Sequence, residues 1–191
     1  MGYQKDILLA LANWLMKKYN NIDLLAGLVP YLRAQRESDL IMIKNKKLFA
    51  FEIKSKRDNL YKLSGQLEDY KSTFDYIYVV LDVKFKYREF GESVGIITYN
   101  NGVVKLEKKA LRNKADPLCQ SLLISKRYKK QALQSINKKD LVIKSLKDAY
   151  SDGYECFKEE KEYDLIVGRS AIGIKDGVYK AFWNVMYLIW A

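Results

Sequence analysis

The segment from residue 37 to residue 54 constrains the fold of this chain most, because it has the pattern of a β-hairpin. Two arms rich in Ile, Leu, Phe and Met flank Asn45-Lys46, which stands where a two-residue turn would reverse the chain. With that turn, Asp39 lies opposite Glu52, and Glu37 lies opposite Lys54. Side chains alternate along a strand, so these four charged groups are predicted to project from one face.

Two carboxylates that face each other destabilise a sheet unless their pKa values shift or a cation neutralises them. The predicted cluster offers carboxylate oxygens with no histidine or cysteine nearby, which favours Mg²⁺ or Mn²⁺ over Zn²⁺. A metal site for phosphate chemistry is therefore expected. The alternative is a solvated hairpin whose acids and lysine only pair across strands. A one-residue change in turn length would also separate the cluster.

The spacing of these residues is that of a known motif. Asp39, followed at hairpin distance by Glu52-Ile53-Lys54, resembles the Asp…(Asp/Glu)-X-Lys signature of the PD-(D/E)XK nuclease superfamily. The next stretch, from Ser55 to Tyr70, resembles the helix in which many members carry a glutamine. The resemblance covers residues 1 to about 115. Within it, the sequence is also similar to the pattern of a group of uncharacterised bacterial and phage proteins. Ser38 stands where a proline precedes the aspartate in the signature.

This resemblance implies a role for each matching residue. Asp39 and Glu52 would ligate the metal ion together with the backbone carbonyl of Ile53. Lys54 would orient or deprotonate the attacking water, or neutralise the charge that develops on phosphorus. Gln66 would brace the site from the following helix.

Glu37 has two open interpretations, an additional acid at the site or the salt-bridge partner of Lys54. The chemistry itself needs activated water and stabilised negative charge, which a carboxylate-held metal and an ammonium group supply together. The chain has no histidine, which excludes Ser-His-Asp and Cys-His triads, HExxH metalloproteases and histidine-dependent nucleases. We therefore expect a metal-dependent nuclease that hydrolyses phosphodiester bonds in DNA.

Two other readings remain open: a catalytically silent nuclease-like fold that binds DNA or a protein partner, and a structural or regulatory basic protein of a phage or mobile element. Lysine and arginine number 34 against 23 acids, giving a formal charge of +11 that suits a nucleic-acid partner. The competing explanation of this charge is that surface lysines keep the protein soluble. For the lysine cluster downstream, the competing explanation is the solvated face of a helix. The candidate nucleic-acid contacts are Lys56, Arg57, Lys126, Arg127, Tyr128, Lys129 and Lys130.

Other features bear on compartment and assembly. Cys119 and Cys156 are far apart and are expected to be reduced thiols, which suits a cytoplasmic protein. No signal segment and no apolar run of membrane-spanning length is apparent, so no membrane partner is expected. The aromatic segment 181–191 is expected to be a packed element or a partner surface. This segment is a pointer to a possible homodimer. An enzyme that cuts both strands of DNA would need either two subunits or two successive binding events.

Along the chain, residues 4–19 have the periodicity of an amphipathic helix, and the segment 22–36 is either a turn or a short edge strand. Asp58 is expected to cap a helix that ends near Ser72. Strands are expected at 76–81, 94–99, 103–106 and 164–169. The predicted fold is α/β: a restriction-endonuclease-like mixed sheet flanked by helices in residues 1–115, with a mainly helical extension in residues 116–191.

Overall fold

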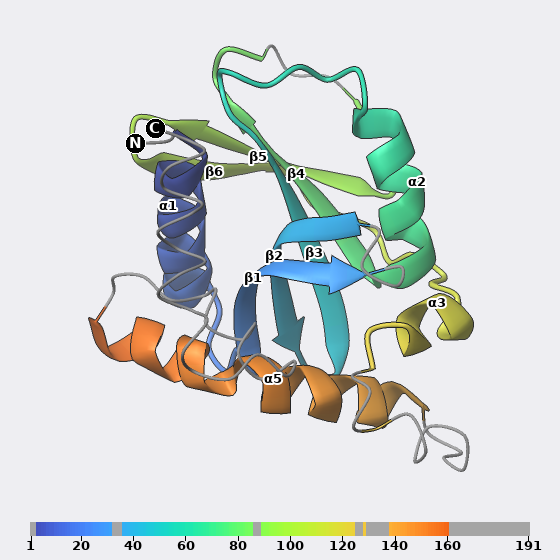
Figure 1. The fold of residues 1–191 in the computed structure, drawn as a ribbon. Helices are drawn as coiled ribbons and strands as arrows, with labels where there is room; N and C mark the ends of the chain where they lie inside the picture. The colour runs from blue at the N-terminus through green and yellow to red at the C-terminus, as the bar shows by residue number, and fades with distance from the viewer. Residues whose placement is uncertain (1–2, 32–35, 86–88, 125–127, 129–137, 161–191) are drawn as a thin grey trace, which may run out of the picture.

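The computed structural model describes residues 3–31, 36–85, 89–124, 128 and 138–160 (Figure 1). The predicted α/β architecture is confirmed, since one mixed sheet is flanked by helices. The described helices and strands are α1 (Tyr3–Lys18), β1 (Leu24–Tyr31), β2 (Arg36–Lys44), β3 (Lys47–Lys54), α2 (Leu63–Thr73), β4 (Tyr76–Asp82), β5 (Val94–Asn100), β6 (Val103–Lys108), α3 (Pro117–Ser121) and α5 (Lys138–Glu160).

The six strands follow their order in the chain across the sheet. β1, β2 and β3 are antiparallel, β4 pairs parallel to β3, β5 pairs parallel to β4, and β6 returns antiparallel. The predicted hairpin register is confirmed from Lys44↔Lys47 to Leu40↔Phe51. Both turn residues, Asn45 and Lys46, have a positive φ, as a type I′ turn requires. The sequence therefore sets which residues of β2 and β3 can meet.

The ambiguous segment after the first helix forms a full strand at the edge of the sheet. β1 pairs only with β2 in the described sheet, and its Pro30 lies opposite Glu37. An edge strand tolerates proline because one side of it makes no ladder hydrogen bonds. The ladder passes from Gly27↔Leu40 to Val29↔Ser38 and skips Leu28, whose φ is 51°. The pairing is thus interrupted beside Asp39.

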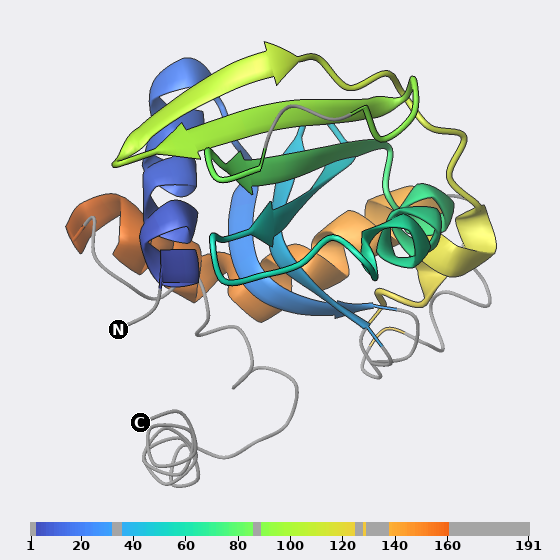
Figure 2. The ribbon, with the colours of Figure 1, turned by 90° about the horizontal axis from the view of Figure 1, so that it is seen from above.

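α1 and α2 lie on either side of β3 and β4 (Figures 1 and 2). α1 buries Ile7, Leu11 and Leu15 and packs against β3 and β6. α2 packs against β4 and buries Leu63, Leu67 and Tyr70. Side chains alternate along a strand, so one set of residues on the central strands faces α1 and the other set faces α2.

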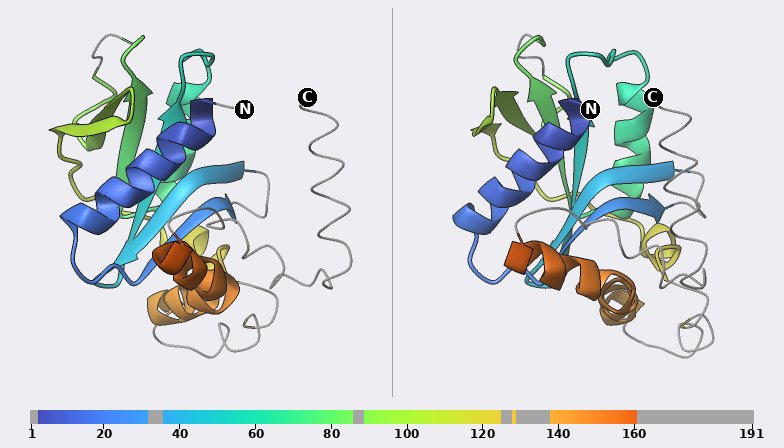
Figure 3. Two further views of the ribbon diagram at one scale, coloured as in Figure 1. Left: turned by 90° about the vertical axis from the view of Figure 1, so that its left-hand side faces the viewer. Right: turned by 60° about the vertical axis from the view of Figure 1, so that its left-hand side comes forward.

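The region after residue 116 is helical where the structure describes it. α5 packs against β1 and α3 (Figure 3), and its Val142, Leu146 and Tyr150 belong to the same core as the sheet. Within the described residues, no helix is long and apolar enough to span a membrane. The strand expected at 164–169 and the aromatic segment 181–191 lie outside the described residues. The domain boundary near residue 115 stays a prediction.

The helix expected to begin at Asp58 is shorter than predicted. α2 starts at Leu63, and its N-cap residue, Lys62, makes no side-chain cap. Asp58 instead accepts hydrogen bonds from the backbone N–H of Ser55 at 2.8 Å and from its hydroxyl at 2.7 Å. The side chain therefore closes the turn that follows β3, a role that aspartate fills as readily as helix capping.

Candidate functional site

The end of β3 carries a buried polar cluster that continues onto α2. Lys54 Nζ donates to Glu52 Oε1 at 2.7 Å and to Gln66 Oε1 at 2.9 Å. Tyr70 Oη donates to the other oxygen of Glu52, Oε2, at 2.7 Å. Glu52 is only 3% exposed and Lys54 only 8%, so the cluster is a buried network and the solvated-hairpin alternative does not apply to these two residues. Buried charges of this kind need paired partners, and here they have them.

Tyr70 reaches Glu52 because aromatic packing fixes its ring. Tyr70 stacks on Tyr31 of β1 with ring centroids 5.2 Å apart, and both rings contact Phe74. Burial, together with the negative charge of Glu52, raises the pKa of Tyr70 well above its usual value, so the hydroxyl remains a donor. Gln66 and Tyr70 stand four residues apart on α2, and this helical spacing brings both to the same strand end.

Asp39 completes the acidic pair from β2. Its Oδ2 accepts the backbone N–H of Ile53 at 2.7 Å, and its Oδ1 accepts from Gln4 Nε2 of α1 at 3.0 Å. Burial, and next the negative charge of Glu52, raise the pKa of Asp39 from 3.8 to about 7, although the Ile53 hydrogen bond and Lys54 oppose the shift. The structure thus brings Asp39, Glu52, Lys54 and Gln66 together, as the motif implies.

The raised pKa of Asp39 predicts how stability depends on pH. Between about pH 4 and pH 7, the folded protein keeps a proton on Asp39 that the unfolded chain has released. The free energy of unfolding should therefore fall as the pH rises through this window, by about 1–3 kcal/mol because partial exposure weakens the full effect. Urea unfolding at several pH values measures it. Asp39→Asn should flatten the slope, and an unchanged slope would contradict the assignment.

Tyr70→Phe tests the contribution of the buried Tyr70 hydroxyl. The ring and its stack on Tyr31 remain, but Glu52 Oε2 loses a buried hydrogen bond. We expect a loss of about 1–3 kcal/mol in the free energy of unfolding, measured by urea denaturation. Tyr76→Phe is the control, because Tyr76 also stacks on an aromatic ring, that of Phe49. Equal effects of the two substitutions would exclude a special role for the Tyr70 hydroxyl.

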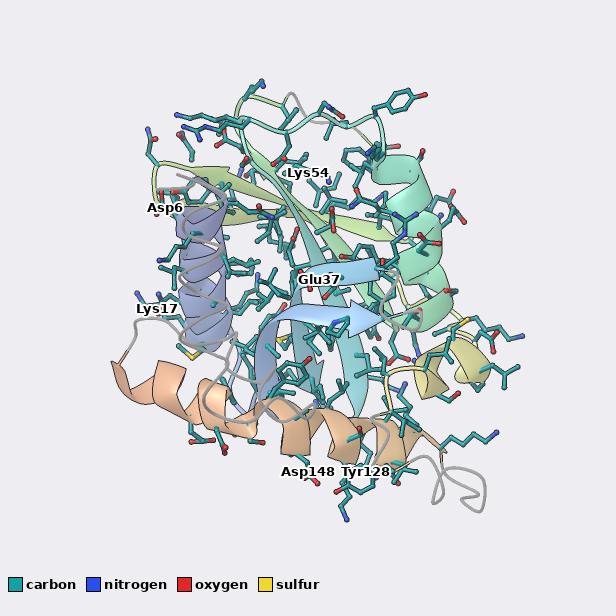
Figure 4. The ribbon with its side chains drawn as sticks, in the orientation of Figure 1. Asp6, Lys17, Glu37, Lys54, Tyr128 and Asp148 are labelled. Carbon is teal, nitrogen blue, oxygen red and sulfur yellow. The ribbon has the colours of Figure 1, made fainter. Side chains whose placement is uncertain are left out.

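Glu37 lies apart from the buried network. It is exposed on β2, whereas the salt-bridge partner of Lys54 is Glu52 (Figure 4 labels Glu37 and Lys54). Its neighbour Arg36 pairs with Asp69 of α2 at 2.8 Å. Of the two open interpretations of Glu37, pairing with Lys54 is therefore not what the structure shows.

The candidate nucleic-acid contacts separate into two groups. Arg57 is exposed and Lys56 is partly exposed in the turn after β3, close in sequence to Lys54. Tyr128 is only 5% exposed and donates to Asp148 of α5, so its ring is buried in this structure, and its contact with nucleic acid stays a prediction. The ring packs inside because α5 covers it. Lys126, Arg127, Lys129 and Lys130 lie outside the described residues.

Sequence reasoning missed several participants. The Gln4 side chain donates to the side chain of Asp39, which is distant in sequence, and Asp58 accepts the backbone N–H of Ser55 in an irregular turn. Neither contact follows from a periodic sequence pattern. The Gln66–Tyr70 spacing was a usable signal for the Tyr70 hydroxyl. Within the described ranges, no three acidic, histidine or cysteine side chains gather as metal ligands, so the site offers two carboxylates.

Comparison with known proteins gives a match to one phage protein family. A family model described as Bacteriophage P4 protein cII matches residues 3–167, and the chain belongs to this family. It is similar to Protein cII of Enterobacteria phage P4, with 32% identity over 111 residues, which are 54% of this chain and 41% of that protein. The matched region thus spans less than half of that relative.

A solved structure shares the fold. It is described as the SPO1766 protein of unknown function from Silicibacter pomeroyi, and the match has a TM-score of 0.57. The match covers 87% of this chain and 98% of that one at 10% identity. At that identity the likeness concerns the fold alone.

Proposed function

We propose that this cII-family protein is a metal-dependent nuclease that hydrolyses phosphodiester bonds in DNA. The observation that supports this most is the pair of acids Asp39 and Glu52, in which the charge of Glu52 adds to burial in raising the pKa of Asp39, and in which the Lys54 ammonium lies 2.7 Å from Glu52. Two neighbouring carboxylates in a buried site are stabilised by a bound cation or by a proton. The mixed sheet supports the proposal because the resemblance to PD-(D/E)XK nucleases implies such a sheet.

The residues present fit Mg²⁺ or Mn²⁺. The donor set is made of oxygens only, as these ions prefer. Burial, and next the negative charge of Glu52, raise the pKa of Asp39, and a bound cation would favour its charged form. Asp39 and Glu52 would hold the ion with the Ile53 carbonyl. Once bound, the ion would supply Lewis-acid stabilisation of phosphate oxygens and a lowered pKa for water.

The side chains around the proposed metal site have separate roles in the reaction. Lys54 Nζ provides the positive charge beside the reacting phosphate, and Gln66 Oε1 keeps that ammonium group in place. Tyr70 Oη holds one oxygen of Glu52, which fixes the orientation of the carboxylate. Lys56 and Arg57, in the next turn, would contact the DNA backbone.

The test is cleavage of supercoiled, linear and single-stranded DNA by the purified protein with Mg²⁺ or Mn²⁺. Asp39→Ala and Lys54→Ala should abolish cleavage, whereas Lys47→Ala, at the other end of β3, should leave it unchanged. Circular dichroism verifies that each variant is folded. Metal addition should also raise the melting temperature of the unaltered protein, because an ion that binds only the folded state stabilises it.

A second candidate is a module that binds DNA or a protein partner without cutting. It is favoured by the saturation of Glu52, whose two oxygens already accept hydrogen bonds from Lys54 and Tyr70. Absence of cleavage on every substrate, with no metal-dependent change in melting temperature, would overturn the nuclease proposal and favour this candidate.

A further inference from the structure

A second polar site lies at the other end of β3 from Glu52 and Lys54. There, a cavity of about 580 Å³ opens between the start of β4, the loop after β6, α3 and the start of α5. Cavities of this size hold small-molecule ligands. Its polar lining consists mainly of cations and amides: Arg112, Asn113, Lys114, Gln120, Lys138 and Lys139.

Two buried amide groups of this lining have no hydrogen-bond partner among the residues that the structure describes. Asn113 Nδ2 and Gln120 Nε2 are both buried and unpaired, and Gln120 as a residue is only 7% exposed. A buried donor without an acceptor costs about 1–3 kcal/mol, so such groups call for a specific explanation. Both residues line the cavity, so an acceptor-rich ligand that reached these two amide groups would satisfy them.

The charge of the lining favours an anion as that ligand. Among the described lining residues, Asp75 supplies the carboxylate, and both of its oxygens already accept hydrogen bonds from the protein. Lys139 Nζ contacts both of its oxygens, at 2.7 and 2.6 Å, and the Leu48 N–H donates to Oδ2 at 2.8 Å. Lys114 and Lys138 are exposed at the rim, where their charge can meet an incoming ligand.

We infer that this cavity binds the phosphate of a small phosphorylated ligand of about nucleotide size. Phosphate oxygens accept several hydrogen bonds at once, which matches two amide donors set among lysine and arginine groups. Val142 and Pro117 supply apolar wall for the organic part of the ligand. The phosphate can belong to a free nucleotide or to the end of a nucleic-acid strand, since both present the same group.

Calorimetric titration of the full chain tests this inference, with AMP, ATP, inorganic phosphate and a short oligonucleotide with or without a 5′-phosphate. The buffer contains EDTA and no divalent ion, so failure of the proposed nuclease site cannot affect the result. We expect saturable binding of at least one phosphorylated probe. Tighter binding of AMP or ATP identifies a free nucleotide as the source, and tighter binding of the 5′-phosphorylated oligonucleotide identifies a strand end.

Two variants locate the binding in the cavity. Gln120→Leu and the double variant Lys114→Ala/Lys138→Ala should each weaken it about tenfold or more. Lys17→Ala, an exposed lysine of α1, should leave it unchanged. Gln120→Leu should not lower the melting temperature of the unliganded protein, because it removes an unpaired buried donor. The inference is overturned if no probe binds saturably, or if Gln120→Leu and Lys17→Ala have the same effect on affinity.

Discussion

Replacing Lys54 with methionine should lower the free energy of unfolding by about 3–5 kcal/mol and reduce DNA cleavage to background. The first effect follows because the Glu52 carboxylate, only 3% exposed, would lose the ammonium group 2.7 Å away and remain buried without its ion-pair partner. Removal of one partner of a buried ion pair is far more costly than removal of both. The second effect follows from the proposed role of Lys54 at the reacting phosphate. Urea denaturation and a plasmid-nicking assay measure the two quantities.

The double variant Glu52→Gln/Lys54→Met separates stability from catalysis. It removes both charges, while an amide at position 52 can still accept the Tyr70 hydroxyl, so most of the lost stability should return. Cleavage should remain absent, because a carboxylate and an ammonium group are both missing. Recovery of cleavage together with stability would show that the pair serves the fold alone.

Gly95→Ala should lower the free energy of unfolding by about 3 kcal/mol, the largest effect expected from adding a single methyl group. A Cβ at Gly95 would lie 2.3 Å from Tyr78 Cε1 and 2.7 Å from the backbone nitrogen of Ala110. The Tyr78 ring is stacked on Phe51 with centroids 5.4 Å apart, so it cannot move aside cheaply. Overpacking of this kind displaces both neighbours. Thermal and urea unfolding measure the loss.

Gly65→Ala is the matched control, since it adds the same methyl group elsewhere. A Cβ at Gly65 would meet nothing within 4 Å, and the residue lies inside α2. Alanine loses less backbone entropy than glycine in a helix, so this variant should be more stable by about 0.5–1 kcal/mol. Equal losses in the two variants would mean that the contacts around Gly95 do not determine the effect.

The hairpin could be predicted because its information is local. Two apolar arms and a two-residue turn fix the register, and the register alone places Asp39 near Glu52. Lys54 follows Glu52 by two residues and lies on the same face of β3, so the ion pair between them also follows from the local sequence. Strands β4, β5 and β6 were predictable for the same reason, from short apolar runs bounded by turn residues.

Tertiary contacts decided the rest. Asp58 could cap a helix or close a turn, and only the path of the chain after β3 selects the turn. Tyr128 stands in a lysine-rich stretch that suggests exposure, yet α5 buries its ring. The cavity around Gln120 is lined by four segments that are distant in sequence, so no local sequence pattern predicts it.

The interruption of β1 at Leu28 has an energetic meaning. A branched side chain at a φ of 51° brings Cβ close to the backbone carbonyl, which costs about 1–2 kcal/mol relative to an ordinary strand residue. The remaining ladder of β1 and β2 must hold this unfavourable conformation in place. Strained backbone of this kind is concentrated at functional positions. Here the local strain lies directly across the ladder from the carboxylate-bearing residue Asp39.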